Sequence, residues 1–182
     1  MGIEQLAVEN ELHPLAGEEW YRLQWAEGPT ESGLGEALGK AEACIAAFSG
    51  LARLFTADIE LLIRNNQSAM HARDRHAMGI ALLQVGGEAA AILQRVAGAA
   101  CLDPAISDSI KIADSATVVA LGLARILVFD VNTVDHNDAC TDKFHVMTTC
   151  DRHALGVALV EQIEKAEIEL DGARETVALK AE

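Results

Sequence analysis

The sequence predicts an all-α protein, a four-helix arrangement built from two tandem helical hairpins and preceded by a short N-terminal helix. Alanine is the commonest of the 182 residues, only 4% are aromatic and only three are proline, a composition that favours long helices. Apolar residues recur at steps of three and four in each long segment, as they do on one face of a helix. Two stretches of the first half also reappear, in the same order, in the second half.

Residues 1–30 are expected to form a separate lead-in segment with a short helix over Leu15–Glu27. Pro14 suits the start of this helix, and Gly28-Pro29 follows its end. Both tryptophans and the only tyrosine lie in this segment, and large aromatic side chains dominate protein interfaces when they are exposed. The alternative is that they fold back and plug the bundle. The candidate interaction residues are Trp20, Tyr21 and Trp25.

Four long helices are expected after this segment. Their predicted bounds are Ser32–Arg64, Asp74–Cys101, Pro104–Val131 and Cys150 to the C-terminus. Asp103 is a suitable N-cap for the third helix, because it precedes a proline at the first helical position. The most apolar run, Val118–Phe129, is shorter than the roughly 20 residues of a bilayer span and contains an arginine. It is therefore predicted to be a buried helix.

An internal repeat links the two halves of the chain. The sequence DRHAMGIAL at 74–82 matches DRHALGVAL at 151–159, with seven of nine positions identical. Further upstream, 41–55 aligns with 113–127, and GLAR is identical in both. We call the shift from 41 to 113 the upstream offset and the shift from 74 to 151 the downstream offset. The downstream offset is larger, so the second copy has five additional residues in its loop. Two ordered matches favour a duplication of one helical hairpin.

The repeat divides the chain into a first hairpin at 31–101 and a second at 102–182, which are expected to pack as one compact domain. Shared ancestry and packing explain the repeated residues better than shared chemistry. Gly79 and Gly156 lie on apolar seams and are predicted to allow close helix contact, and Gly50 and Gly122 invite the same interpretation.

The most strongly repeated polar residues lie at the start of a helix in each hairpin. Their aspartates are predicted to be N-caps, because a carboxylate there accepts hydrogen bonds from the amides of the first turn. Their histidines suit acid or base chemistry, although an imidazole near a helix start is more often a solvated surface residue. The repeat-equivalent residues are Asp74, Arg75 and His76 in the first copy and Asp151, Arg152 and His153 in the second.

The predicted topology brings the loops at 65–73 and 132–149 to one end of the bundle, where five of the six histidines gather. Imidazole and thiolate are good ligands for zinc and other transition metals. The spacing matches no established zinc pattern, and the sequence has no Glu-x-x-His pair of the kind that di-iron bundles use. No cofactor is therefore predicted, and a metal site remains an alternative. Its candidate ligands are His136, Cys140, His145, Cys150 and His153.

Charge and cysteine usage restrict the partners and the compartment. The formal net charge is −14 at pH 7, and such an acidic surface repels nucleic-acid phosphates. The first residues lack the basic and apolar regions of a signal peptide, and the four cysteines form no Cys-x-x-Cys pair. A cytoplasmic protein with reduced thiols is expected, without nucleic-acid or membrane partners.

No catalytic or phosphate-binding motif is present in the sequence. The main functional hypothesis is therefore a protein-binding or self-associating module, such as an adaptor, an inhibitor or a chaperone-like protein, rather than an enzyme. Two alternatives stay open. One is a metal- or small-ligand-binding protein, with or without catalytic activity, that uses the histidine- and cysteine-rich loop end. The other is a structural component of a larger assembly.

Overall fold

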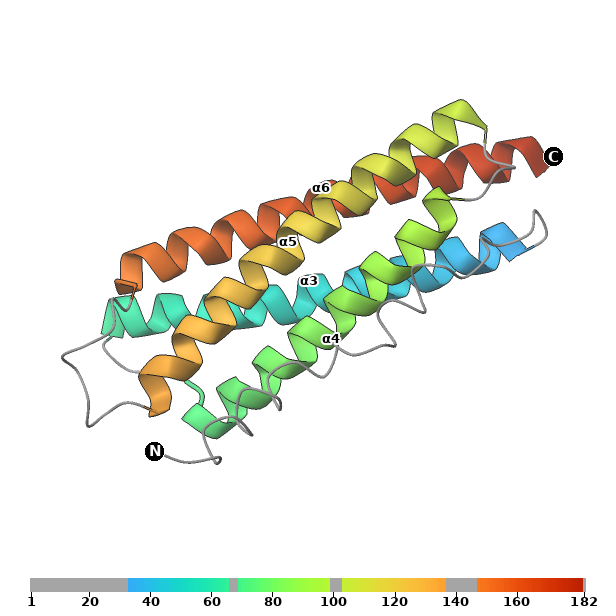
Figure 1. The fold of residues 1–182 in the computed structure, drawn as a ribbon. Helices are drawn as coiled ribbons and strands as arrows, with labels where there is room; N and C mark the ends of the chain where they lie inside the picture. The colour runs from blue at the N-terminus through green and yellow to red at the C-terminus, as the bar shows by residue number, and fades with distance from the viewer. Residues whose placement is uncertain (1–32, 66–68, 99–102, 137–146, 182) are drawn as a thin grey trace.

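The computed structural model describes residues 33–65, 69–98, 103–136 and 147–181 (Figure 1). Within these residues it consists of four α-helices and has no strand, which confirms the all-α, four-helix prediction. The predicted N-terminal helix lies outside the described residues. The helices are α3 (Leu34–Asn65), α4 (Ala72–Ala97), α5 (Pro104–His136) and α6 (Thr149–Ala181).

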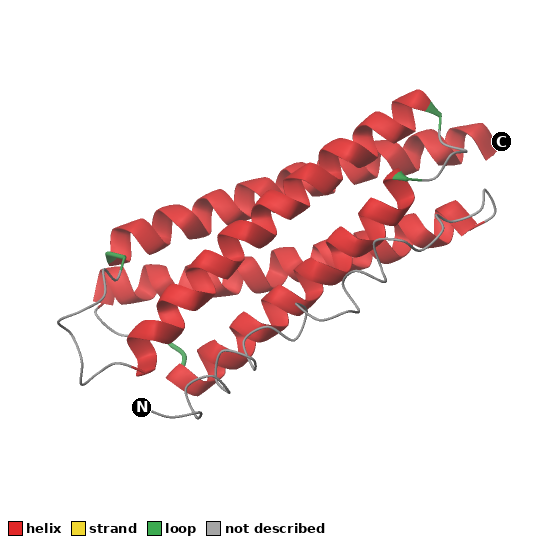
Figure 2. Cartoon of the chain, viewed as in Figure 1, coloured by secondary structure: helices red, strands yellow, loops and turns green. Residues whose placement is uncertain are grey.

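Successive helices run in opposite directions along one elongated bundle (Figures 1 and 2). The main contacts follow the order α3–α4, α4–α5, α5–α6 and α6–α3, so that α3 and α5 occupy diagonal corners. Each helix therefore has one side in the core and one side facing outward. This arrangement also brings the α3–α4 and α5–α6 loops to the same end.

The core is formed by the apolar positions that recur at helical spacing, and aliphatic side chains from all four helices meet along the bundle axis. The largest fully buried side chains include Phe48 and Phe55 from α3, Leu82 and Leu93 from α4, Ile110 and Leu127 from α5, and Leu159 and Ile163 from α6. At the start of α5, the Asp103 carboxylate accepts a hydrogen bond from the Ala105 amide at 2.9 Å, as predicted for an N-cap.

Two repeated glycines let neighbouring helices approach closely. A Cβ added at Gly79 would lie 2.8 Å from Val128 Cγ1, and a Cβ added at Gly156 would lie 2.7 Å from Thr56 Oγ1. Both contacts are too short for a real Cβ, so the predicted role of these glycines in helix contact is confirmed. Thr56 and Val128 are related by the upstream offset, and the two glycines by the downstream offset. The two contacts are therefore equivalents in the repeat.

The same interpretation is wrong for Gly50 and Gly122. A Cβ added at either position would meet nothing within 4 Å. Both residues lie on the outward-facing side of their helices, where no neighbouring described helix packs against them. Their sequence context could not separate a glycine in a helix seam from one on an outer face, because small residues occur on both sides of α3.

Candidate functional site: two loop-end junctions and an apolar outer face

A buried ion pair joins the end of α3 to the start of α4. Asp58 and Arg75 are only 3% and 7% exposed, and Arg75 Nε donates to Asp58 Oδ2 at 3.0 Å. The other carboxylate oxygen, Oδ1, accepts hydrogen bonds from the backbone amides of Ala69 and Met70 at 2.8 and 3.1 Å. Arg75 Nη2 also donates to the Met70 carbonyl at 3.1 Å. One carboxylate therefore ties together two helices and the loop between them.

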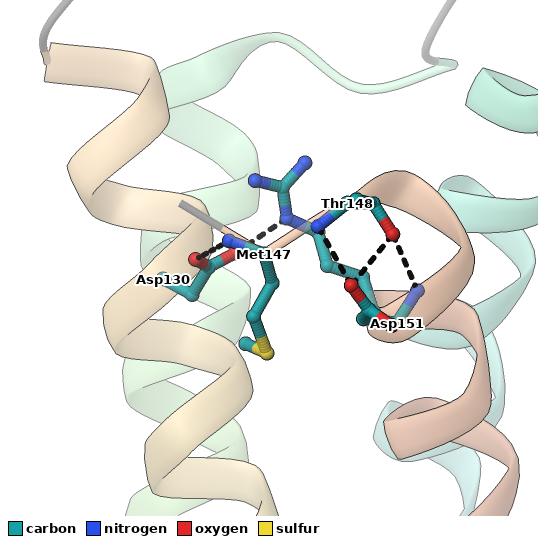
Figure 3. A network of polar contacts seen from close by, with 5 residues as sticks. Asp130, Met147, Thr148 and Asp151 are labelled. Carbon is teal, nitrogen blue, oxygen red and sulfur yellow. Dashed lines mark hydrogen bonds and ion pairs between the residues drawn. The ribbon is translucent and has the colours of Figure 1, made fainter. Parts of the chain in front are cut away.

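A second junction of the same kind joins α5 to α6 (Figure 3). Arg152 Nε donates to Asp130 Oδ2, and the Met147 amide donates to Asp130 Oδ1 at 3.0 Å. Asp130 is the equivalent of Asp58 at the upstream offset, and Arg152 is the equivalent of Arg75 at the downstream offset. The ion pair joins the same atoms in both junctions. The repeated arginines thus have a structural role in the described residues.

The repeated aspartates at 74 and 151 are not N-caps, which corrects the sequence-based prediction. The helices begin three residues earlier than N-caps at these positions would imply, so each aspartate occupies the third helical position. In α6, Thr148 is the capping residue: its Oγ1 accepts from the Asp151 amide at 3.2 Å. Asp151 Oδ2 in turn accepts from the Thr148 amide and hydroxyl at 3.0 and 2.6 Å, a reciprocal capping box. These hydrogen bonds hold the pKa of Asp151 below its usual range.

The start of α4 lacks this side-chain cap. His71 occupies the capping position and makes no side-chain hydrogen bond to the helix end. Its carbonyl accepts from the amides of Asp74 and Arg75, both at 3.0 Å. The two helix starts that look most alike in sequence therefore differ in how their first amides are satisfied.

The histidine- and cysteine-rich end is only partly described. His136 ends α5, but its side chain is not among those described, and Cys140 and His145 lie outside the described residues. Cys150 is exposed, and His153, like His76, is partly buried. Over the residues that the structure places, no group of three His, Cys, Asp or Glu side chains is positioned to hold a metal. The metal site stays a prediction that depends on 137–146. The aromatic candidates Trp20, Tyr21 and Trp25 also lie outside the described residues.

The outer face of α5 is the most apolar exposed surface of the described bundle. Five of the ten exposed large hydrophobic residues belong to this helix, which alone supplies as many as α3 and α6 together. The prediction that Val118–Phe129 is buried is wrong for this side, because the run is apolar all round and only its inner side contacts α4 and α6. The five residues are Ile112, Val118, Val119, Ile126 and Phe129.

Four of these five residues, all except Val118, follow a seven-residue repeat along the helix. Ile112, Val119 and Ile126 are spaced by seven, and so are Ser115, Gly122 and Phe129. We call these six residues the α5 stripe. At 1.5 Å per residue it is about 26 Å long. A heptad spacing of this kind brings side chains onto one seam, where a second helix can pack along its whole length.

The equivalent surface of α3, found by applying the upstream offset in reverse, has smaller side chains. We call it the α3 stripe. Leu54 is the one large hydrophobic residue of the α3 stripe. At three other positions the α5 stripe has a large apolar residue, Ile112, Val119 or Phe129, where α3 has lysine or alanine. The α3 stripe consists of Lys40, Ala43, Ala47, Gly50, Leu54 and Ala57.

Ion pairs connect α3 to α6 beside the α3 stripe. Arg53 Nη2 lies 3.1 Å from Glu164 Oε1, and Arg174 donates to Glu42. The α5 equivalents of Glu42 and Arg53 at the upstream offset are Asp114 and Arg125. No ion pair is shown for either within the described residues, and burial raises the pKa of Asp114.

On α4, uncharged residues occupy the positions equivalent to the α6 partners. At the downstream offset, Gly87 corresponds to Glu164 and Ala97 to Arg174. The α4–α5 side of the bundle thus lacks, among the described residues, the equivalents of the cross-helix ion pairs on the α3–α6 side.

No protein-family model, curated protein or solved structure matches this chain. Two helical stretches, Arg73–Ala97 and Pro104–Asp130, are long and apolar enough to cross a membrane by length and composition. The core helices of a bundle meet the same criterion, and both stretches contribute to the core described above.

Proposed function

We propose that this protein is a protein-interaction module, and that its binding surface is the outer face of α5. The observation that carries the proposal is the α5 stripe, in which four exposed large apolar side chains lie at heptad spacing, with a serine and a glycine between them, on a protein of strongly acidic net charge. Exposed apolar patches of this kind mark surfaces that are covered by another molecule. An adaptor, an inhibitor or a chaperone-like protein would each use such a face.

The proposal draws support from the α3 stripe. The two stripes occupy equivalent positions in the two hairpins, yet only the α5 stripe has large β-branched and aromatic side chains. Bundle packing does not require these side chains, because they lie outside the core. Large apolar residues that add nothing to the core of the isolated chain are explained by a contact outside it.

We propose also that the two hairpins arose by duplication. Support comes from the two Asp–Arg junctions and the two glycine contacts, all at the offsets found in the sequence. Immediately after such a duplication, the outer faces of α3 and α5 would have had the same sequence. The face on α5 then diverged toward binding, while the face on α3 kept small residues and ion pairs.

Photo-crosslinking in living cells tests the binding surface. The photo-reactive residue benzoylphenylalanine is placed at position 126 of α5 and, as the matched control, at position 54 of α3. Ile126 and Leu54 are 53% and 61% exposed, so both sites accept the label without disturbing the core. We expect a discrete protein adduct from position 126 and none from position 54. Equal adducts from both positions, or none from either, would contradict the proposal.

A further inference from the structure

We infer that the partner of the α5 stripe is a second copy of this chain, so that two α5 helices pack antiparallel across a two-fold axis. The inference rests on the proposed function, because it names the occupant of the same face. It is carried by two independent features: the distribution of charge over the surface and the self-complementary order of residues along the stripe.

Charge disfavours the outer face of α6 as the surface where two copies meet, and it does not disfavour the outer face of α5. Each chain has a formal net charge of −14, so apposed acidic surfaces repel each other. On α6 the exposed acidic residues outnumber the exposed basic residues. On α5, from Pro104 to Asp130, the exposed charged residues are Asp108, Lys111 and Arg125, and the first two form an ion pair. With Arg125 set against the partly buried Asp114, this face has no excess of acidic residues.

The residues of the α5 stripe match one another when a second α5 is laid antiparallel. In a single antiparallel register, Ile112 faces Phe129 of the other copy, and Val119 faces Gly122. In the same register Ile126 faces Ser115. Each residue of the set Ile112, Val119 and Ile126 thus faces a residue of the set Ser115, Gly122 and Phe129. In two of these three pairs, a large side chain faces a small residue. Because a two-fold axis relates the copies, each pair occurs twice in the interface, as an isologous interface requires.

The α3 stripe does not offer the same seam. In the equivalent register Lys40 faces Ala57, and the other layers pair alanine or leucine with alanine or glycine. A second copy would bury a lysine and little apolar area there. The lead-in segment, residues 1–30, precedes α3 in the chain, and α3 lies diagonally across the bundle from α5. This segment has six glutamates and one arginine. The antiparallel match that the α5 stripe makes with itself does not extend to it.

Sedimentation analysis of the full chain tests the inference. We expect the wild type to dimerise reversibly in a dilution series, and Ile126→Glu to weaken dimerisation by about tenfold or more, since it buries a carboxylate in an apolar seam twice per dimer. Leu54→Glu is the matched control: it adds the same charge at the equivalent exposed position and leaves the dimer intact. A monomeric wild type, or equal effects of the two variants, would overturn the inference.

The register is tested by a compensating substitution. In the antiparallel arrangement, Ser115→Lys in one chain faces position 126 of the other, so adding it to Ile126→Glu restores dimerisation. A parallel arrangement would place glutamate against glutamate and lysine against lysine, and the double variant would stay monomeric. Higher salt is expected to tighten the wild-type dimer, because it screens repulsion between acidic copies. A dimer that weakens with salt would overturn the charge argument.

Tryptophan fluorescence distinguishes a second copy on the α5 face from the N-terminal residues of the same chain packing there. Both tryptophans lie in residues 1–32. We expect their emission to be the same in the Ile126→Glu monomer and in the wild type at equal ionic strength. An emission shift in that variant with an unchanged monomeric mass would assign the α5 face to the lead-in segment and overturn the inference. Adducts to a different protein in the crosslinking experiment would overturn it too, yet leave the proposed function standing.

Discussion

The outer faces of α3 and α5 lie on opposite sides of one bundle and occupy equivalent positions in the two hairpins, but their chemistry differs. The α3 stripe is lined by alanines and flanked by ion pairs to α6, whereas the α5 stripe exposes isoleucine, valine and phenylalanine. At the loop end the hairpins instead share the same Asp–Arg–backbone contacts. The loop-end junctions are alike in the two halves, and the surfaces that face away from the bundle are not.

The core shows how the halves can differ inside without losing packing. Phe48 on α3 fills the space beside Gly86, where an added Cβ would lie 2.8 Å from its ring. The residues at the corresponding offsets are Ala120 and Ile163, which are both buried. The large side chain is on α3 in the first hairpin and on α6 in the second. Total volume is thereby kept, which is what a close-packed interior tolerates best.

The largest expected effect comes from breaking the junctions that the hairpins share. Asp58→Ala removes the carboxylate that pairs with the buried Arg75 guanidinium and accepts from two loop amides, so we expect a loss of about 3–5 kcal/mol in the free energy of unfolding. Asp130→Ala should cost less, because the Asp130 and Arg152 side chains are more exposed than those of the first pair. Urea unfolding measures both.

The control for the junctions is Glu164→Ala, which breaks an exposed pair with Arg53 and should cost less than about 1 kcal/mol. If Asp58→Ala and Glu164→Ala gave equal losses, the buried junction would have no special structural role. If Asp130→Ala cost more than Asp58→Ala, burial would not govern the difference between the hairpins.

The junctions also show what the sequence alone could and could not predict. Helix number, the core positions and the close contacts at Gly79 and Gly156 follow from apolar periodicity and from the repeat. The alignment of 41–55 with 113–127 stops just short of Asp58 and Asp130, which continue it at the same offset. The repeat therefore makes these two aspartates equivalent. Their burial could not be predicted, because it depends on a loop that folds back onto the helix end.

The exposure of one side of α5 could not be predicted either, for a different physical reason. Periodicity identifies a buried face only where polar residues mark the other face. Val118–Phe129 has apolar residues on both sides and one arginine, so the pattern could not show which side the bundle covers. For the proposed metal ligands, three of five fall at positions whose side chains are not described, so that prediction stands untested.

A second comparison sets the seam glycines against the outer-face glycines. Gly79→Ala and Gly156→Ala place a methyl group within 3 Å of a neighbouring side chain, so we expect each to lower stability by about 1–3 kcal/mol. Gly50→Ala meets open space and should raise stability by up to about 1 kcal/mol, because alanine favours a helix. Gly122→Ala should do the same in the Ile126→Glu background, where no second copy faces position 122. Thermal unfolding of the four variants measures this. If Gly79→Ala were more stable than the wild type, the Val128 side chain would have to move aside at little energetic cost.

The helix caps give a smaller contrast between the hairpins. Thr148→Ala removes a side-chain cap and the hydroxyl that binds Asp151, so we expect a loss of about 1 kcal/mol in the free energy of unfolding. His71→Ala, at the equivalent position of α4, removes no capping hydrogen bond and should be near neutral. Chemical unfolding at neutral pH compares them, and equal losses would show that the reciprocal box adds nothing.

The smallest expected effect concerns Asp114, whose equivalent on α3 pairs with Arg174. Burial raises the pKa of Asp114, so the folded state binds its proton more tightly than the unfolded state does. The stability that this carboxyl contributes is therefore present below its unfolded pKa and is lost as pH rises through its folded pKa. Asp114→Asn should stabilise the protein at neutral pH by no more than about 0.5 kcal/mol, and the gain should vanish in acid.

Unfolding of wild type and Asp114→Asn at several pH values measures the difference. The matched variant Glu42→Gln breaks the pair with Arg174 and should have the opposite sign at neutral pH. A gain for Asp114→Asn that persists in acid would mean that charge is not its cause. If dimerisation through α5 covers Asp114, its desolvation increases, and the neutral-pH gain should be larger in the dimer than in the Ile126→Glu monomer.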